Sequence, residues 1–258
     1  MNLDGKIAVV TGGAMGNGLG IVQVFLKLGA TVVILDRDDK LGETLHQLRQ
    51  TYSNVIGYKV DITDRDLVNR CVKAIIDKYG RIDILVNNAG VAKLVRFEEM
   101  TPEVRDFHID VNIKGTWNVT QAVYPYMVKQ KYGKIVNLSS VTGPKVADAG
   151  EVAYATTKAA LIGFTKGLAM EGVEHGINVN AILPGYIMTP MVEGIAKDTD
   201  ANNPDSVVKG IADGIPMGRL GTIEELGNLA AFLVMLLVIS QVQNLSLMEL
   251  RLCLKLKV

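Results

Sequence analysis

The chain is short of the residues on which several classes of protein depend. It has only two cysteines in 258 residues, Cys71 and Cys253, and its three histidines, His46, His108 and His175, are scattered singly. None of these residues has the spacing of metal ligands, so each is interpreted as a packing or surface residue. We expect no metal requirement and a reducing, cytoplasmic location.

The sequence also lacks an excess of charge and a long apolar run. Lysine plus arginine and aspartate plus glutamate both number 27, so the formal net charge is zero. The sequence therefore has no excess of positive charge that would bind nucleic acid or anionic lipid. The longest apolar stretch, residues 229–239, is shorter than the roughly 20 residues that span a bilayer. A strand-like run begins at Ile7, so we expect no cleaved signal segment. We expect no nucleic-acid partner and no membrane association.

What the sequence does have is a regular alternation of short β-branched runs with longer amphipathic stretches. The runs lie at residues 7–10, 31–35, 55–60, 84–86, 134–138 and 178–182. This alternation predicts an α/β fold, a single domain over residues 1–258 with a Rossmann-type, doubly wound parallel sheet and helices on both faces. Two capping pairs, Thr63 with Asp66 and Thr222 with Glu225, predict helix starts.

A glycine-rich turn follows the first strand-like run. Residues 11–20 read Thr-Gly-Gly-Ala-Met-Gly-Asn-Gly-Leu-Gly and lead into a helix-like stretch. Glycine lets backbone amides approach an anionic ligand, and the helix N-terminus adds a favourable dipole. The spacing departs from Gly-x-Gly-x-x-Gly, and the Lys-Ser/Thr pair of a P-loop is missing, which favours a Rossmann variant. For this loop alone, an ordinary turn is an equal alternative.

Polar residues recur where the predicted strands end. They are Asp36 after the second strand, Asp61-Ile62 after the third, Asn87-Asn88-Ala89-Gly90 after the fourth and Ser139-Ser140 after the fifth. Asp36 stands near the offset at which a carboxylate binds ribose hydroxyls. Asp61 and the Asn-Asn-Ala-Gly segment, taken singly, are better explained as a cap and a turn. Ligands bind beyond the carboxyl ends of such strands, so the recurrence indicates one shared ligand.

Tyr154 and Lys158 stand four residues apart in a predicted helix that runs to about residue 170, so they share a face. Of the eight tyrosines, only Tyr154 has a lysine at this spacing. A phenol with a pKa near 10 exchanges protons poorly at neutral pH unless a cation favours the phenolate, and Lys158 is such a cation. Ser140 could hydrogen-bond a substrate carbonyl, with a helix or turn cap as its alternative role.

Together these residues resemble the short-chain dehydrogenase/reductase family over roughly residues 3–234. The matching motifs are Thr11-Gly12 with Gly16 and Gly18, Asp61, Asn87-Asn88-Ala89-Gly90, Asn112, Ser140, Tyr154 with Lys158, and Pro184-Gly185 with Thr189. Within that family, residues 105–110, 139–143 and 184–191 are most similar to the UcpA-type oxidoreductases.

The resemblance implies an NAD(H)-dependent oxidoreductase that interconverts a small-molecule alcohol and a ketone or aldehyde by direct hydride transfer. It implies Tyr154 as general acid/base, Lys158 as its partner, Ser140 as the group that orients the substrate, and Asn112 as the holder of a relay water. The residues expected at the cofactor are Gly12, Met15, Gly16, Asn17, Gly18, Asp36, Asp61, Ile62, Asn88, Ala89, Gly90, Tyr154, Lys158, Pro184, Gly185, Ile187 and Thr189. Asp36 favours NAD over NADP, although Arg37 could bind a 2′-phosphate.

The resemblance also implies a homo-oligomer, a tetramer or dimer, built on helices around residues 103–129 and 152–170. Residues 186–216 are too long for an ordinary connection, and we expect them to form an irregular lid over the substrate. The lid's apolar members indicate a substrate with a hydrophobic body, or simply packing; they are Met188, Met191, Val192 and Ile195. Two other functions stay open: a catalytically silent cofactor-binding regulatory or scaffold protein, and an epimerase or dehydratase on the same fold.

The resemblance stops after residue 233. Related chains normally continue with a Tyr-x-Thr-Gly motif and a final strand ending Asp-Gly-Gly, whereas residues 235–258 contain no glycine. Read one base out of register, the codons of residues 238–244 permit Tyr-Leu-Thr-Gly-Thr-Glu, and those of residues 247–249 permit Asp followed by an obligatory Gly. We hypothesise that an insertion, a deletion or a sequencing error near Val234 replaced the native ending.

The nucleotide sequence tests this hypothesis directly. We expect its shifted frame to encode the Thr-Gly and Asp-Gly ending, and the frame-corrected chain to be more stable or better assembled, because the replaced strand would close one sheet edge. Residues 250–258 alternate apolar and polar side chains, which offers the present tail a way to pair as an edge strand. Codons whose shifted frame lacks that ending would refute the hypothesis.

Overall fold

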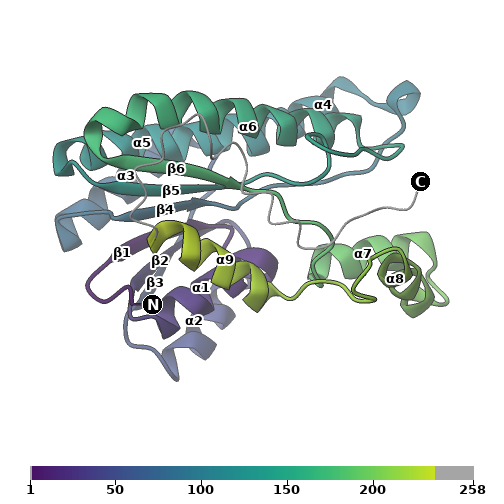
Figure 1. Cartoon of the computed structure of the whole chain (residues 1–258), viewed down its shortest axis with the longest axis horizontal. Coiled ribbons are helices and arrows are strands. Elements are labelled where there is room, and N and C mark those ends of the chain that lie inside the picture. Colours follow the sequence, from purple (N-terminus) through teal and green to yellow (C-terminus); the bar gives the residue numbers. More distant parts are fainter. Residues whose placement is uncertain (1, 236–258) are drawn as a thin grey trace.

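The computed structural model describes residues 2–235, which form one α/β domain; residues 236–258, on which the shifted-frame hypothesis falls, lie outside that range. Six parallel strands form one sheet in the order β3-β2-β1-β4-β5-β6 (Figure 1). The strands are β1 (Ile7–Thr11), β2 (Thr31–Asp36), β3 (Val55–Lys59), β4 (Ile84–Asn87), β5 (Gly133–Leu138) and β6 (Ile177–Ile182). The predicted fold class is confirmed.

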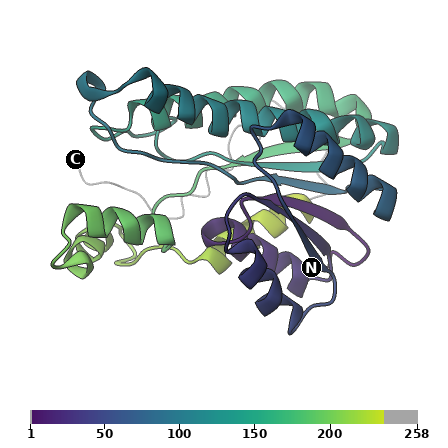
Figure 2. The ribbon, with the colours of Figure 1, turned by 180° about the vertical axis from the view of Figure 1, so that it is seen from behind.

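Helices cover both faces of the sheet, and Figures 1 and 2 show the two layers from opposite sides. One face carries α1 (Gly16–Lys27), α2 (Leu41–Arg49) and α9 (Ile223–Met235). The other carries α3 (Arg65–Tyr79), α5 (Thr116–Gln130) and α6 (Val152–Gly172). α4 (Pro102–His108) continues through a π-helical turn, Ile109–Gly115, into α5; short 3-10 turns occupy Phe97–Glu99 and Val173–His175.

The central strand β1 explains why the strand sequences are apolar throughout. Successive side chains of a strand point to opposite faces, and both faces here are covered by helices. Ala8 and Val10 pack with α1 and α9, whereas Ile7 and Val9 pack with α3 and α5. A strand buried on both sides therefore shows a continuous hydrophobic run instead of an alternating one.

The two predicted capping pairs have different outcomes. At the start of α9, Thr222 and Glu225 exchange hydrogen bonds between side chain and backbone N–H, at 3.1 and 2.8 Å, so this pair is confirmed. The pair of Thr63 and Asp66 is wrong. The cap of α3 is Asp64, whose carboxylate accepts a backbone N–H of the first turn, because the Thr63 hydroxyl is used in the turn before the helix.

Residues 186–216 are not irregular, contrary to the prediction. They contain α7 (Pro190–Thr199) and α8 (Pro204–Asp213), which lie beyond the carboxyl ends of the strands (Figure 1). Each helix begins with a capping side chain, Thr189 or Asn203, followed by proline. Proline is favourable at the first helical position, where its missing N–H has no helical partner, so this pairing was a readable start signal.

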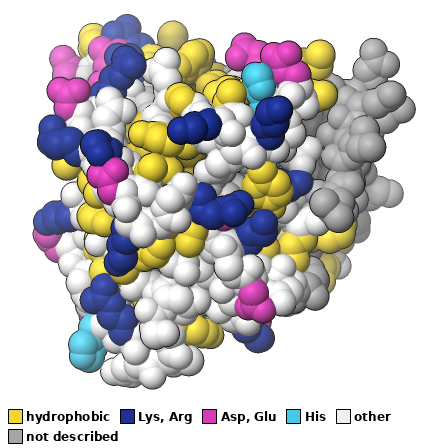
Figure 3. Space-filling view, turned by 90° about the vertical axis from the view of Figure 1, so that its left-hand side faces the viewer, with side chains coloured by type: hydrophobic (Ala, Val, Ile, Leu, Met, Phe, Trp, Pro, Cys, Tyr) yellow, Lys and Arg dark blue, Asp and Glu magenta, His cyan; other side chains and the backbone are white. Residues whose placement is uncertain are grey.

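The side of the molecule away from α7 and α8 carries basic and acidic side chains interspersed with hydrophobic ones (Figure 3). Among residues 2–235, no helix combines the length and apolar character needed to span a bilayer.

Candidate active site

A pocket of about 710 Å³ opens at the carboxyl ends of the strands. The glycine-rich turn after β1 and the polar segments after β2 to β5 all contribute to its wall, together with the residues after β6, so the sheet brings them to one edge. All but one of the residues expected at the cofactor line it, the exception being Gly18. Ser140 lines the pocket as well, whereas Asn112 does not.

The glycine-rich turn after β1 has the shape that a dinucleotide requires. Gly12 has a φ of +64°, and a Cβ there would lie 2.8 Å from the Ala89 Cα, so a larger residue would force this turn and the β4 loop apart. Gly18 contributes packing instead of pocket lining, because a Cβ on it would lie 2.0 Å from the Gly12 carbonyl oxygen.

A buried polar atom in the same turn lacks a protein partner. Asn17 lines the pocket, and within the described chain its Oδ1 is buried without a hydrogen bond. A buried polar atom of this kind needs a partner, which a ligand of the pocket can provide. The turn therefore fits a dinucleotide, with α1 beginning at Gly16 beneath it.

Asp36, the last residue of β2, is held in place by two backbone amides. Its carboxylate accepts hydrogen bonds from the N–H groups of Ala14 at 2.8 Å and Asp38 at 2.9 Å. The neighbouring Arg37 extends away to Asp61, with 3.2 Å between guanidinium nitrogen and carboxylate oxygen. Asp36 thus lines the pocket with its carboxylate held in a fixed position, and the guanidinium beside it is already paired.

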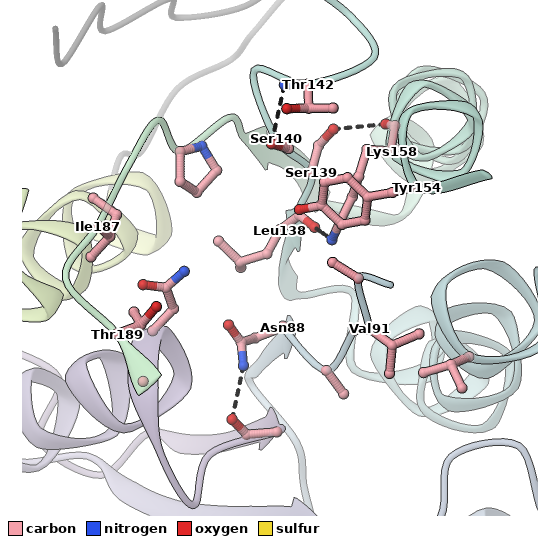
Figure 4. Close-up of a pocket in the computed structure, with 18 of the residues that line it drawn as sticks. Asn88, Val91, Leu138, Ser139, Ser140, Thr142, Tyr154, Lys158, Ile187 and Thr189 are labelled. Carbon is pink, nitrogen blue, oxygen red and sulfur yellow. Dashed lines mark hydrogen bonds between the residues drawn. The ribbon is translucent and has the colours of Figure 1, made fainter. Parts of the chain in front are cut away.

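Ser140, Tyr154 and Lys158 lie together on one side of the pocket, opposite Ile187 and Thr189 (Figure 4). α6 places Tyr154 and Lys158 on one face, with the Lys158 Nζ 5.6 Å from the centre of the Tyr154 ring. The Lys158 ammonium donates a hydrogen bond to the Leu138 carbonyl at 2.8 Å. Two separate elements, α6 and the end of β5, therefore fix this group.

Burial dominates the proton affinities of the Tyr154–Lys158 pair. It lowers the pKa of Lys158 to about 8, because a desolvated ammonium is unfavourable. It raises the pKa of Tyr154, an effect that Glu151 increases and that a hydrogen bond with Ser140 partly opposes. The protein alone therefore shifts the pKa of Tyr154 in the direction opposite to the one expected from the sequence.

Asn112 lies in the π-helical turn, away from the pocket wall, and its side chain is engaged by protein. Its Oδ1 accepts the Val91 N–H at 2.8 Å, and its Nδ2 donates to the Val91 carbonyl at 3.0 Å and to the Thr157 hydroxyl at 2.9 Å. This side chain connects the loop after β4 to α6. The water-holding role of Asn112 stays a prediction.

Several pocket residues carry no sequence motif and were missed. Two groups lie on the loops after β4 and β5; they are Val91, Ala92, Leu94, Val146, Ala147, Asp148 and Glu151. Their only sequence signal is position, since each group follows a strand whose carboxyl end meets the site.

Comparison with known proteins places this geometry in a family. Residues 6–200 match the family described as short chain dehydrogenase. The oxidoreductase UcpA of Salmonella typhimurium (strain LT2) is 49% identical over 231 residues, which cover 90% of this chain and 88% of that protein. The expected similarity to UcpA-type oxidoreductases is confirmed.

Solved structures agree with the sequence comparison. The crystal structure of levodione reductase matches with a TM-score of 0.86 at 30% identity, covering 90% of this chain and 92% of that one. The structure of L-sorbose reductase from Gluconobacter frateurii, complexed with NADPH and L-sorbose, matches with a TM-score of 0.85 at 31% identity, covering 90% of each chain. The chain belongs to the short-chain dehydrogenase family of oxidoreductases, which use NAD(P)(H) as cofactor.

Proposed function

We propose that this protein is an NAD(H)-dependent dehydrogenase/reductase that interconverts a neutral alcohol and the corresponding ketone or aldehyde. The observation that carries the proposal is the meeting of Ser140, Tyr154 and Lys158 on one wall of a pocket that the glycine-rich turn after β1 also lines. A bound nicotinamide supplies or accepts the hydride. Levodione reductase and L-sorbose reductase are, by name, reductases of carbonyl compounds.

The three side chains divide the proton chemistry among them. The Ser140 hydroxyl donates a hydrogen bond to the substrate oxygen and orients it, while the Tyr154 hydroxyl gives that oxygen its proton during reduction. Lys158, with a pKa of about 8, is mostly protonated at pH 7, and its hydrogen bond to Leu138 holds the charge beside the phenol. Because burial raises the pKa of Tyr154, the Lys158 cation has to oppose this effect by stabilising the phenolate, and a bound oxidised nicotinamide would add a second positive charge.

The preference for NAD rests on Asp36. Its carboxylate can accept hydrogen bonds from the adenosine ribose hydroxyls and repels a 2′-phosphate. Two backbone amides prevent this carboxylate from turning away. Arg37, the group that could bind the phosphate, is paired with Asp61. L-sorbose reductase was solved with NADPH, which is a property of that protein. The cofactor preference of the present chain is tested by comparing NADH with NADPH.

The substrate half of the pocket favours an uncharged molecule with an apolar body. Its wall includes Val91, Leu94 and Val192. Its acidic groups are Asp148 and Glu151. Burial raises the pKa of the Tyr186 phenol, and these two carboxylates lie close enough to raise it further. A carboxylate or phosphate near the reacting carbonyl would be repelled by these side chains. We propose that residues 186–216, with α7 and α8, cover this half as a lid.

We propose that the protein assembles as a homo-oligomer through α5 and α6. Exposed hydrophobic side chains on and beside these helices support this: Trp117 is 53% exposed, Met170 62% and Val173 57%. Trp117 packs against Phe164 with 5.1 Å between ring centres, which joins the two helices into one surface. Apolar surface of this kind is suited to a self-complementary contact.

Replacement of Tyr154 by phenylalanine tests the catalytic proposal. The change removes the proton donor and keeps the ring, so we expect kcat to fall about 100-fold or more while NADH affinity stays unchanged. The rate is measured at 340 nm against neutral ketones, aldehydes, sugars and steroids, with keto acids as charged comparisons. Tyr79→Phe is the matched control and should retain activity, because Tyr79 is the last residue of α3 and does not line the pocket. Near wild-type turnover by Tyr154→Phe would show that the assigned role is wrong.

The cofactor proposal predicts that kcat/KM with NADH exceeds that with NADPH by about 100-fold, the effect of a close like charge in a partly desolvated site. Asp36→Asn, which keeps an acceptor atom and removes the charge, should reduce this ratio by at least about tenfold. Asp39→Asn, at an exposed position paired with Lys59, should leave the ratio unchanged. A wild-type protein that uses NADPH as well as NADH would contradict the assignment.

The assembly proposal predicts a dimer or tetramer in solution, measured by light scattering after size-exclusion chromatography. Trp117→Glu places a charge on the proposed contact and should shift the mass toward that of a monomer. Met217→Glu, at a position that is also 53% exposed but lies outside α5 and α6, should have no such effect. A monomeric wild-type protein would overturn the proposal.

A further inference from the structure

The segment after the Asn-Asn-Ala-Gly motif is fixed at every second residue. Val91 exchanges two hydrogen bonds with the Asn112 side chain, at 2.8 and 3.0 Å. The Lys93 N–H donates to the His108 Nε2 at 3.0 Å, and the Val95 N–H donates to the Gly150 carbonyl at 3.0 Å. The residues between these anchors, Ala92 and Leu94, line the pocket, in the half that we assign to the substrate. The anchors therefore set the position of a pocket wall.

His108 is the anchor in the middle of this segment. It is the last residue of α4, is completely buried and has its ring edge-on to Phe107, with 6.2 Å between ring centres. The Nδ1 lies 2.8 Å from the Val104 carbonyl oxygen. A carbonyl can only accept, so Nδ1 carries the hydrogen and Nε2 is the acceptor that the Lys93 N–H requires. Both ring nitrogens have a defined partner, and one of them holds the loop.

The backbone geometry of the helical stretch and of the loop after β4 explains the spacing of the anchors. His108 and Asn112 are four residues apart on a continuous helical stretch, and Val91 and Lys93 are two apart on the segment that lies along it. A step of four in a helix rises about 6 Å, and a step of two in an extended chain rises nearly 7 Å, so the spacings match. Loss of the His108 acceptor would release the centre of the segment while both ends stayed attached.

We propose that His108 is a positioning residue of the substrate site: its Nε2 holds the Lys93 backbone and thereby sets the Ala92–Leu94 wall against which the carbonyl compound binds. The inference rests on the proposed function for the identity of that ligand. The wall touches the substrate body and no reacting atom, so its displacement weakens binding of the ground state and the transition state alike. Such a loss raises KM with little change in kcat.

Two substitutions separate positioning from general stability. His108→Leu fills a similar volume and has no acceptor, whereas His108→Gln brings an amide oxygen to about the place of Nε2. The matched control is Gln130→Leu, because Gln130 is also a backbone clamp: it bonds the Ile82 N–H at 3.1 Å and the Ile82 carbonyl at 2.9 Å, before β4 and away from the pocket. Each variant is compared at a temperature at which it is fully folded.

The first readout is amide hydrogen exchange, which needs no turnover. In His108→Leu we expect the Lys93 amide to lose protection and the peptide over residues 91–95 to exchange faster, whereas His108→Gln and Gln130→Leu should match the wild type there. Unchanged exchange in His108→Leu would overturn the inference even if the protein is an active reductase. If the protein turns over no carbonyl compound, the proposed function is overturned, but the exchange measurement still tests the role of His108.

The second readout is kinetic, on the neutral carbonyl compound that the panel identifies. We expect His108→Leu to raise KM about tenfold while kcat stays within about threefold of the wild type, because one hydrogen bond that orders the pocket wall is lost. His108→Gln should restore KM, because it returns that hydrogen bond. NADH affinity should stay constant throughout. A rise in KM of the same size in Gln130→Leu, or a His108→Gln variant as impaired as His108→Leu, would show that the effect is only structural.

Discussion

The hydrogen bonds between the end of β1 and the end of β4 are the constraint on which the site depends. The Thr11 hydroxyl accepts the N–H groups of Asn88 and Ala89 at 3.0 Å each, and the Asn88 side chain donates to the carbonyls of Thr11 and Gly12 at 3.0 and 2.9 Å. β1 is paired with β2 on one side and β4 on the other, so the strand order reverses here. A crevice forms at such a reversal, and these bonds fix its two walls relative to each other.

The site also contains a feature that is unfavourable by itself, a buried ammonium. Lys158 is nearly inaccessible to solvent, and burial lowers its pKa to about 8. Its only charge-assisted hydrogen bond in the described chain is to the Leu138 carbonyl. Burial equally disfavours the Tyr154 phenolate. Each group is unfavourable when it is charged alone, but opposite charges on the two groups stabilise each other, which suits the proton-donor role that we propose for Tyr154.

The two halves of the pocket are built in different ways. The half that we assign to the cofactor is formed by backbone turns and strand ends: the Gly12 N–H donates to the Leu35 carbonyl of β2, and backbone amides hold the Asp36 carboxylate. The half that we assign to the substrate is formed in part by the loops after β4 and β5, and the Asn112 and His108 side chains bond the backbone of the loop after β4. Loops can differ between relatives while the strand ends keep their places, and this is consistent with structural relatives that are named for compounds as different as levodione and L-sorbose.

The sequence by itself determined the structural features that arise from residues close together along the chain. Continuous β-branched runs gave the strands, because burial on both faces removes any polar position, and Thr222 with Glu225 gave a helix start through contacts three residues apart. Tertiary structure decided what depends on distant partners. Only the packing of the loop after β4 on α4 and the π-helical turn shows that Asn112 bonds Val91 and that His108 bonds Lys93, because the bonded groups lie 21 and 15 residues apart in sequence.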